Sequence, residues 1–166
     1  MTPRFLLVFV GGLVVGTLDI VYACLFWRLK AGVPTRRILQ SVAAGLLGNA
    51  SFAGGGATAA LGLALHFAIA LTMSAAYYAA AVRLPVLASR PVACGAAYGL
   101  LMYGIMNYVV VPLSAAAETA AKDPLWIALS IAIHVLLIGI PIALFTARAC
   151  EAALRQLASA SQAVAP

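Results

Sequence analysis

Four apolar segments, each long enough to cross a lipid bilayer, constrain this chain more than any other feature. They cover residues 5–27, 57–82, 92–113 and 125–147. About 20 residues, each rising roughly 1.5 Å, are needed to span the hydrocarbon core. The chain is 65% hydrophobic and only 8% charged, whereas soluble domains carry about a quarter charged residues. The sequence therefore predicts an all-α membrane protein with four transmembrane helices.

The stretch between the first two apolar segments is less regular. Residues 35–48 place apolar side chains at helical spacing, with Thr35 as the expected N-cap and Gly48-Asn49 as the expected stop. The apolar face of this helix comprises Ile38, Leu39, Val42, Leu46 and Leu47. We expect an amphipathic helix that lies at the membrane interface or re-enters the bundle. Gln40 and Asn49 could line an entrance formed by this insert.

Length and charge define the domain and its partners. We expect residues 1–150 to form a single membrane domain and residues 151–166 a short solvated tail. The formal charge of +6 comes from scattered basic residues with no run longer than Arg36-Arg37. Such charges usually set topology or meet anionic headgroups. The predicted partner is therefore the lipid bilayer, and nucleic acid is not expected.

The distribution of basic residues does not determine which side of the membrane the termini occupy. The side that would hold both termini carries Arg4, Arg83, Arg90, Arg148 and Arg155, and the opposite side carries Arg28, Lys30, Arg36, Arg37 and Lys122. Because five basic residues face five, the positive-inside rule does not decide the orientation. An even number of spans with short tails favours both termini in the cytoplasm.

Each span carries one conspicuous polar residue in its interior. These are Asp19, His66, Asn107 and His134. At a rise of about 1.5 Å per residue, they lie roughly 10–15 Å from the residues that end the spans on one side of the membrane. Successive spans alternate in direction, so all four could form one layer near the midplane.

The polar residues also anchor a faint internal duplication. GTLDIVY (16–22) matches GIMNYVV (104–110), and LALHFAIAL (63–71) matches IAIHVLLIG (131–139). The two halves would have parallel topology, related by an axis along the membrane normal. The pattern indicates a two-helix repeat as one possibility.

Small residues accompany the polar layer and predict close helix packing. The expected packing positions are Gly12, Gly16, Gly95, Gly99, Gly62 and Gly104. Small faces allow helices to approach closely, so the polar side chains are expected to point into the bundle. The same faces could equally drive homo-oligomerisation.

Three interpretations of the polar layer stay open. In the first, the side chains only hold helices together through hydrogen bonds. In the second, a carboxylate and a neighbouring imidazole exchange protons and couple them to a small solute or ion. We favour the second, because intramembrane ionisable groups are expensive and usually functional.

The third interpretation is a cofactor site. His66 and His134 could ligate a haem iron from both sides, and Asp19 with these two histidines could hold a divalent metal. Since nothing else in the sequence indicates a cofactor, none is the primary prediction.

Enzymatic chemistry is not expected. The motifs HExxH, GxSxG and the P-loop are absent, and only four acidic residues exist. Cys24, Cys94 and Cys150 are widely spaced without a CxxC pair, so neither a disulfide framework nor a zinc site is indicated.

Three sequence stretches carry a resemblance. GLVVGTLDIVYA, ILQSVAAGLLG followed by GGGATAALGLALHFAIAL, and YGLLMYGIMNYVVVPLSA together resemble uncharacterised bacterial inner-membrane proteins, similar in style to the YagU-like group. The resemblance covers about residues 8–145. It implies a polytopic helical fold in the bacterial inner membrane. It assigns no activity and no site residues.

Overall fold

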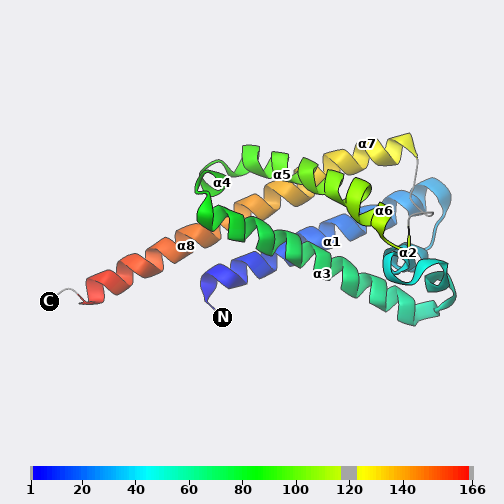
Figure 1. Ribbon diagram of the computed structural model, residues 1–166, viewed down its shortest axis with the longest axis horizontal. Helices are drawn as coiled ribbons and strands as arrows, with labels where there is room; N and C mark the ends of the chain where they lie inside the picture. The colour runs from blue at the N-terminus through cyan, green and yellow to red at the C-terminus, as the bar shows by residue number, and fades with distance from the viewer. Residues whose placement is uncertain (1, 117–122, 165–166) are drawn as a thin grey trace.

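The computed structural model describes residues 2–116 and 123–164, and every regular element in that part of the chain is helical. Four helical stretches are long and apolar enough to cross a membrane, and they cover Pro3–Ala31, Gly55–Arg83, Pro91–Leu113 and Pro124–Ser159. They form an elongated bundle (Figure 1). The predicted all-α fold with four apolar spans is confirmed. Lys122, which was expected to flank the fourth span, lies outside the described residues.

The first two spans are unbroken α-helices. Helix α1 covers Pro3–Ala31 and helix α3 covers Gly55–Arg83. Pro3 stands in the first turn of α1, where a missing N–H costs nothing. The helix ends at Gly32, whose φ of 65° is left-handed and whose N–H donates to the Arg28 carbonyl. A glycine is favoured there because the left-handed region carries no Cβ penalty for it.

The last two spans are each interrupted by a π-helical segment. The third span consists of α5 (Pro91–Ile105), η2 (Met106–Val110) and α6 (Val111–Leu113). The fourth consists of α7 (Pro124–Ile133), η4 (His134–Gly139) and α8 (Ile140–Val164), which continues the span well past the predicted end at residue 147.

Proline explains where both π segments lie. Pro112 and Pro141 each follow the π segment by two residues. A proline lacks an N–H and its ring clashes with the carbonyl four residues earlier, which is at Tyr108 in one case and Leu137 in the other. Both of those carbonyls lie inside the π segments. The wider turn relieves this conflict, as π-bulges do in interrupted helices.

The insert between the first two spans is a helix followed by a single-turn element. Helix α2 covers Thr35–Leu47, and the 3-10 helix η1 covers Gly48–Ala53. In Figure 1, α2 lies at the end of the bundle opposite the termini and is seen nearly end-on. Its bounds agree with the prediction to within one residue. Thr35 is its first helical residue, however, and the N-cap position is held by Pro34 without a side-chain bond.

The face of α2 that packs against α3 is formed by small and polar residues. Gln40, Ala43 and Ala44 are buried, whereas the exposed fractions of Leu46 and Leu47 are 64% and 41%. The reason is a close approach to Gly62 of α3, where an added Cβ would lie 1.9 Å from the Leu39 carbonyl oxygen. Only small side chains fit on a helix face held this near to its neighbour. Leu46 and Leu47 consequently point outward, whereas Ile38, Leu39 and Val42 are half-buried.

Glycines bring the long helices together as well. An added Cβ on Gly12 or Gly16 of α1 would meet α3 side chains at 2.8–2.9 Å. On Gly95 and Gly99 of α5 it would meet backbone atoms of η4 or α8 at 2.1–2.8 Å. Gly104, by contrast, would meet nothing within 4 Å. The two GxxxG pairs therefore pack within this chain, while Gly104 makes no close helix contact.

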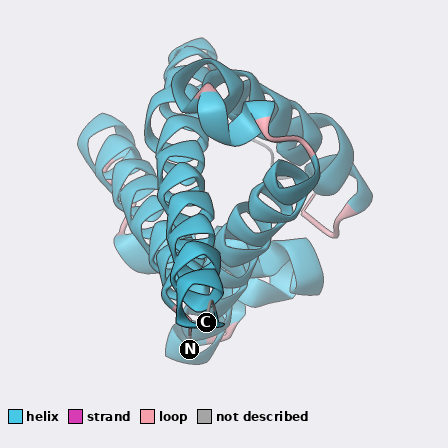
Figure 2. Ribbon diagram, turned by 90° about the vertical axis from the view of Figure 1, so that its left-hand side faces the viewer, coloured by secondary structure: helices cyan, strands magenta, loops and turns pink. Residues whose placement is uncertain are grey.

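The packed core occupies the half of the bundle nearer the termini. Its cluster of buried side chains comprises Val15, Ala70, Tyr77, Ile138, Ile142 and Ala143. Short helix α4 (Val86–Ser89) closes that end, where the Leu87 carbonyl accepts a bond from the Tyr77 hydroxyl. The two termini lie toward this same end (Figure 1). Figure 2, turned by 90°, shows the helices surrounding the long axis.

Candidate functional site

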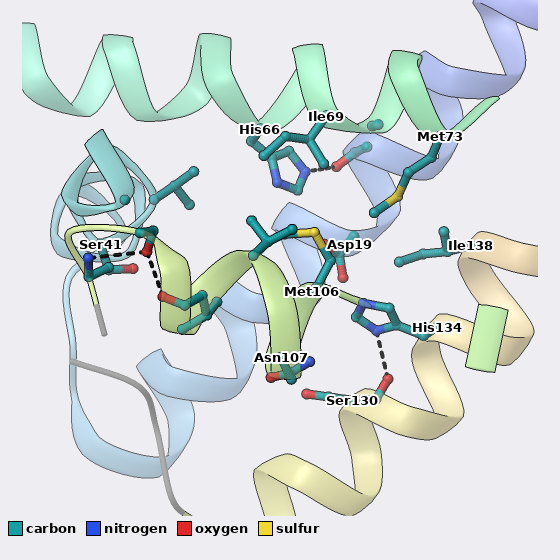
Figure 3. A pocket seen from close by; sticks show the side chains of 18 of the residues that line it. Asp19, Ser41, His66, Ile69, Met73, Met106, Asn107, Ser130, His134 and Ile138 are labelled. Carbon is teal, nitrogen blue, oxygen red and sulfur yellow. Dashed lines mark hydrogen bonds between the residues drawn. The ribbon is translucent and has the colours of Figure 1, made fainter. Parts of the chain in front are cut away.

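A cavity of about 310 Å³ lies beside the packed core, on the side toward α2. Val15, Ala70 and Ile138 belong both to the core cluster and to the cavity wall. All four polar residues singled out from the sequence line this cavity, namely Asp19, His66, Asn107 and His134. Figure 3 shows them converging from α1, α3, η2 and η4. A volume of this size is at the lower end of the range for small-molecule sites.

A second space of about 300 Å³ adjoins the first and shares these four residues. It adds Ala23 and Trp27 of α1 and Ile38 of α2 to the wall. These residues lie nearer the end of the bundle where α2 sits. The polar layer is thus the meeting point of the two spaces.

The two histidines have defined tautomers. The Nε2 atom of His66 lies 2.8 Å from the Gly16 carbonyl oxygen, and the Nδ1 atom of His134 lies 2.8 Å from the Ser130 carbonyl oxygen. A carbonyl oxygen only accepts, so the ring nitrogen that it contacts must carry the proton. In the neutral rings, Nδ1 of His66 and Nε2 of His134 are therefore lone-pair acceptors.

Asp19 lies between the two imidazoles in Figure 3. Its carboxylate interacts electrostatically with both His134 and His66. Within the described residues, it accepts no hydrogen bond and pairs with no lysine or arginine. The carboxylate therefore has unused acceptor capacity beside the cavity.

The remaining polar side chains of the wall follow the pattern of the histidines. Asn107 donates from Nδ2 to the Tyr103 carbonyl at 2.9 Å. The hydroxyls of Ser41 and Ser114 donate to backbone carbonyls three residues earlier at 2.7 and 2.8 Å. These donors are committed to the backbone, and the Ser114 oxygen also accepts from the Ala116 N–H at 3.2 Å. A ligand would therefore meet the remaining oxygen lone pairs and one N–H of Asn107.

The Ser130 hydroxyl is an exception. It is buried, lines both spaces and has no hydrogen-bond partner within the described residues. The Tyr22 hydroxyl lies within reach of a weak hydrogen bond to it, although neither hydroxyl meets strict hydrogen-bond geometry with a described group. A buried unpaired hydroxyl is costly, and a ligand or water in the adjacent space would relieve that cost.

An aromatic cluster closes the bundle near the second space. It comprises Tyr22, Phe26, Trp27 and Trp126. Trp126 stacks on Tyr22 with 5.5 Å between ring centroids and also lines both spaces. Trp126 therefore connects the cluster to the cavity.

An ion pair ties the same end together. Lys30, near the end of α1, donates to the carboxylate of Asp123, the N-cap of α7. This bond and the Trp126 backbone N–H, which also donates to the carboxylate, hold the pKa of Asp123 below its usual range. The pair links the first span to the fourth at the mouth of the second space.

The expected entrance residues do not line the cavity. Gln40 turns toward α3, where it donates to the Gly55 carbonyl and to the Thr58 hydroxyl. Asn49 lies in η1, away from both spaces. The residues that α2 contributes to the main cavity are Ser41, Val42 and Gly45. Gln40 faces α3 because the close approach at Gly62 buries its side-chain amide, and a buried amide needs hydrogen-bond partners.

Sequence reasoning missed several cavity features. Ser41 and Ser114 lie on segments read as interfacial or terminal, and Ser130 is not among the expected site residues. The π segments were not anticipated either. A signal for them existed, because Pro112 and Pro141 follow Asn107 and His134 by five and seven residues.

The cavity does not present a ready metal site. Within the described residues, no three histidine, cysteine, aspartate or glutamate side chains converge closely enough to hold a metal ion. The bis-histidine haem site at His66 and His134 stays a prediction.

Comparisons with protein-family models, with curated proteins and with solved structures gave no match. The similarity to the YagU-like group accordingly stays a prediction.

Proposed function

We propose that this protein moves a small solute or ion across a bacterial inner membrane, coupled to protons, through the cavity at Asp19, His66, Asn107 and His134. The observation that supports this most is the cavity itself. A layer that served only to hold helices together would be filled by its own side chains, whereas this one borders a partly open space of about 310 Å³.

The hydrogen bonds argue against a purely adhesive role as well. Asn107 and His134 bond to carbonyls four residues earlier in their own spans, so these bonds join no helices. His66 does join two helices through the Gly16 carbonyl. Asp19 makes no hydrogen bond within the described residues. Three of the four polar residues thus form no interhelical bond, so packing does not explain why polar groups are placed within apolar spans.

Proton coupling follows from the groups that face Asp19. His66 faces it from α3 and His134 from η4, while Tyr22 lies one turn along its own helix. The cavity residues of α2 and α6 contribute no titratable group. A carboxylate beside two imidazole lone pairs can hold a proton in one state and release it when a solute arrives.

The test is a vesicle assay with a pH-sensitive dye in the lumen. A small organic cation, a neutral analogue and an anionic analogue are added outside in separate runs. We expect at least one of them to shift the lumenal pH of vesicles containing the wild-type protein, beyond the change in protein-free vesicles. Asp19→Asn, which removes the charge and keeps the shape, should abolish that shift.

Thr17→Val is the matched control for this assay. Thr17 lies two residues away on α1, is exposed and bonds only to the Leu13 carbonyl of its own helix. It should support the wild-type pH shift. The proposal is wrong if no solute class shifts the lumenal pH of wild-type vesicles, or if Asp19→Asn behaves as the wild type does.

A further inference from the structure

The polar wall of the cavity is dominated by acceptors, and this bears on the class of solute. His66, His134 and Asn107 each donate an N–H to a backbone carbonyl. Ser41 and Ser114 do the same with their hydroxyls. What these five side chains still offer is chiefly lone pairs, since Asn107 retains one further N–H and one lone pair of Ser114 already accepts from the Ala116 N–H. The Ser130 hydroxyl of the same wall can donate or accept.

The charge of the wall points the same way. Asp19 is the one acidic side chain that lines the described spaces, and no lysine or arginine lines either of them. A ligand carboxylate or phosphate would meet a carboxylate and several lone pairs with no cation to balance it. A cation that carries N–H donors would pair with Asp19 and supply protons to the remaining acceptors.

Apolar side chains make up most of the rest of the wall. Ile69, Met73 and Met106 surround the polar layer in Figure 3. Trp126 adds an aromatic face on the side of the second space, which suits a cation. A bare metal ion would leave this apolar surface uncovered, whereas an organic body would fill it.

From these observations we infer that the solute is a small organic cation, a protonated amine or guanidinium on an apolar body, that pairs with Asp19. The inference rests on the proposed function for the transport step but not for binding. One monovalent cation enters as one proton leaves the site shared by Asp19 and the two imidazoles. The net charge of the site is then the same before and after the exchange.

The experiment measures binding directly, apart from transport. The wild-type protein in lipid nanodiscs is titrated calorimetrically at pH 7.5 with cyclohexylguanidinium, cyclohexylurea and cyclohexanecarboxylate. The three probes share one ring, and the first two share a planar head that differs in charge. A guanidinium stays charged at every accessible pH. We expect cyclohexylguanidinium to bind at least about tenfold more tightly than either analogue, because burying an unpaired charge or losing its partner is costly.

Two variants test whether Asp19 causes the preference for the cationic probe. Asp19→Asn should remove the preference for cyclohexylguanidinium over cyclohexylurea, while Thr17→Val should keep it. Retained binding of the urea to Asp19→Asn would show that the variant is folded with its cavity intact. Equal or tighter binding of the urea or the carboxylate to the wild-type protein would overturn the inference. So would a preference that survives in Asp19→Asn.

The outcomes separate the two proposals. Cyclohexylguanidinium that binds selectively but shifts no lumenal pH in vesicles would leave the inference standing and remove the transport function. A pH shift driven by the urea or the carboxylate alone would leave the transport function standing and remove the inference. Direct binding of Mn²⁺ or Zn²⁺ at micromolar concentration, with no binding of the guanidinium, would identify a metal site and overturn the inference.

Discussion

At the scale of single residues, the chemistry of the cavity depends on which polar side chains donate their N–H or O–H groups to backbone carbonyls. The sequence allowed Asp19, His66, Asn107 and His134 to be identified, since each is the isolated polar group of an apolar span. It did not reveal that Nε2 of His66 and Nδ1 of His134 are both committed to backbone carbonyls. Those bonds depend on rotamers and on the neighbouring helix, which a linear pattern does not encode.

The glycines of α5 offer a test at the same scale. An added Cβ on Gly99 would lie 2.1 Å from the His134 carbonyl oxygen. We expect Gly99→Ala to lower the free energy of unfolding by about 1–3 kcal/mol, as overpacking does. Denaturant titration in detergent would measure this loss. Gly104→Ala is the matched control, because its Cβ would meet nothing within 4 Å. A comparable loss in both variants would contradict the close approach.

The Lys30–Asp123 pair predicts a pH dependence. The pKa of Asp123 is lowered in the folded protein, so the pair stabilises the fold above the unfolded pKa of about 3.9. That contribution is lost as the pH falls through the folded pKa. Asp123→Asn keeps a side chain able to cap α7 but removes the charge. We expect the wild type to melt slightly above Asp123→Asn at pH 7, and the difference to vanish in acid.

The control for this pair is the exposed ion pair on α8. Arg155 and Glu151 lie 3.7 Å apart and are largely exposed. Glu151→Gln should leave the melting temperature nearly unchanged at pH 7, because exposed pairs contribute little. Melting curves followed by tryptophan fluorescence from pH 3 to 8 would test both variants. A difference for Asp123→Asn that grows toward acid would refute the assignment.

At the scale of elements, the spans were predictable and their interruptions were not. Hydropathy locates the four long helices, because length and apolarity decide what can cross a bilayer. The face of α2 that packs against α3 could not be predicted, since the approach at Gly62 selects small residues over large apolar ones. The π segments were not predicted, because hydropathy does not register the effect of Pro112 and Pro141 on helix geometry.

Pro141 tests the origin of the π segment that carries His134. We expect Pro141→Ala to restore regular α-helical bonding over His134–Gly139 and to raise the melting temperature, since proline disfavours a helix interior by up to about 3 kcal/mol relative to alanine. His134 would then point elsewhere. The proton-linked pH shift should fall by about tenfold or more, as small misplacements at a site can cost that much.

Hydrogen exchange of the backbone amides in η4, together with the vesicle assay, would measure both effects. Pro91→Ala is the control, because Pro91 stands at the first position of α5, where it costs no hydrogen bond. An unchanged pH shift in Pro141→Ala with altered exchange in η4 would show that the π segment does not position His134.

At the scale of the whole molecule, the core cluster lies toward the termini and the cavity lies toward α2. The helix pairs are also unequal. Gly11 brings α1 against Phe145 of α8, whereas α3 and α5 meet through long side chains, with the Tyr98 hydroxyl donating to the Met73 carbonyl. An exact two-fold relation between the halves would make these two interfaces alike. The internal repeat stays a prediction.

Orientation is the prediction that belongs to this scale. Both termini lie toward one end of the bundle and α2 lies at the other (Figure 1). Because five basic residues face five, a small change in charge should move the balance. We expect a C-terminal fluorescent fusion of the wild type to fluoresce in the cytoplasm. Replacing Arg83 and Arg90 by alanine should reduce that signal and increase the activity of a C-terminal phosphatase fusion.

The π segments carry a consequence for how such a chain tolerates changes in length. Each one amounts to a single residue inserted into an α-helix. Deleting one residue within Leu136–Ile138 would shorten the span by only about 1.5 Å and convert the wide turn into a regular one. The helices α7 and α8 would keep their relative orientation, whereas the side chains of the π segment itself, His134 among them, would change direction. The helix would still cross the bilayer while its polar residue left the cavity. Insertions and deletions at these two places are therefore a route by which related chains could gain or lose the site without losing the fold.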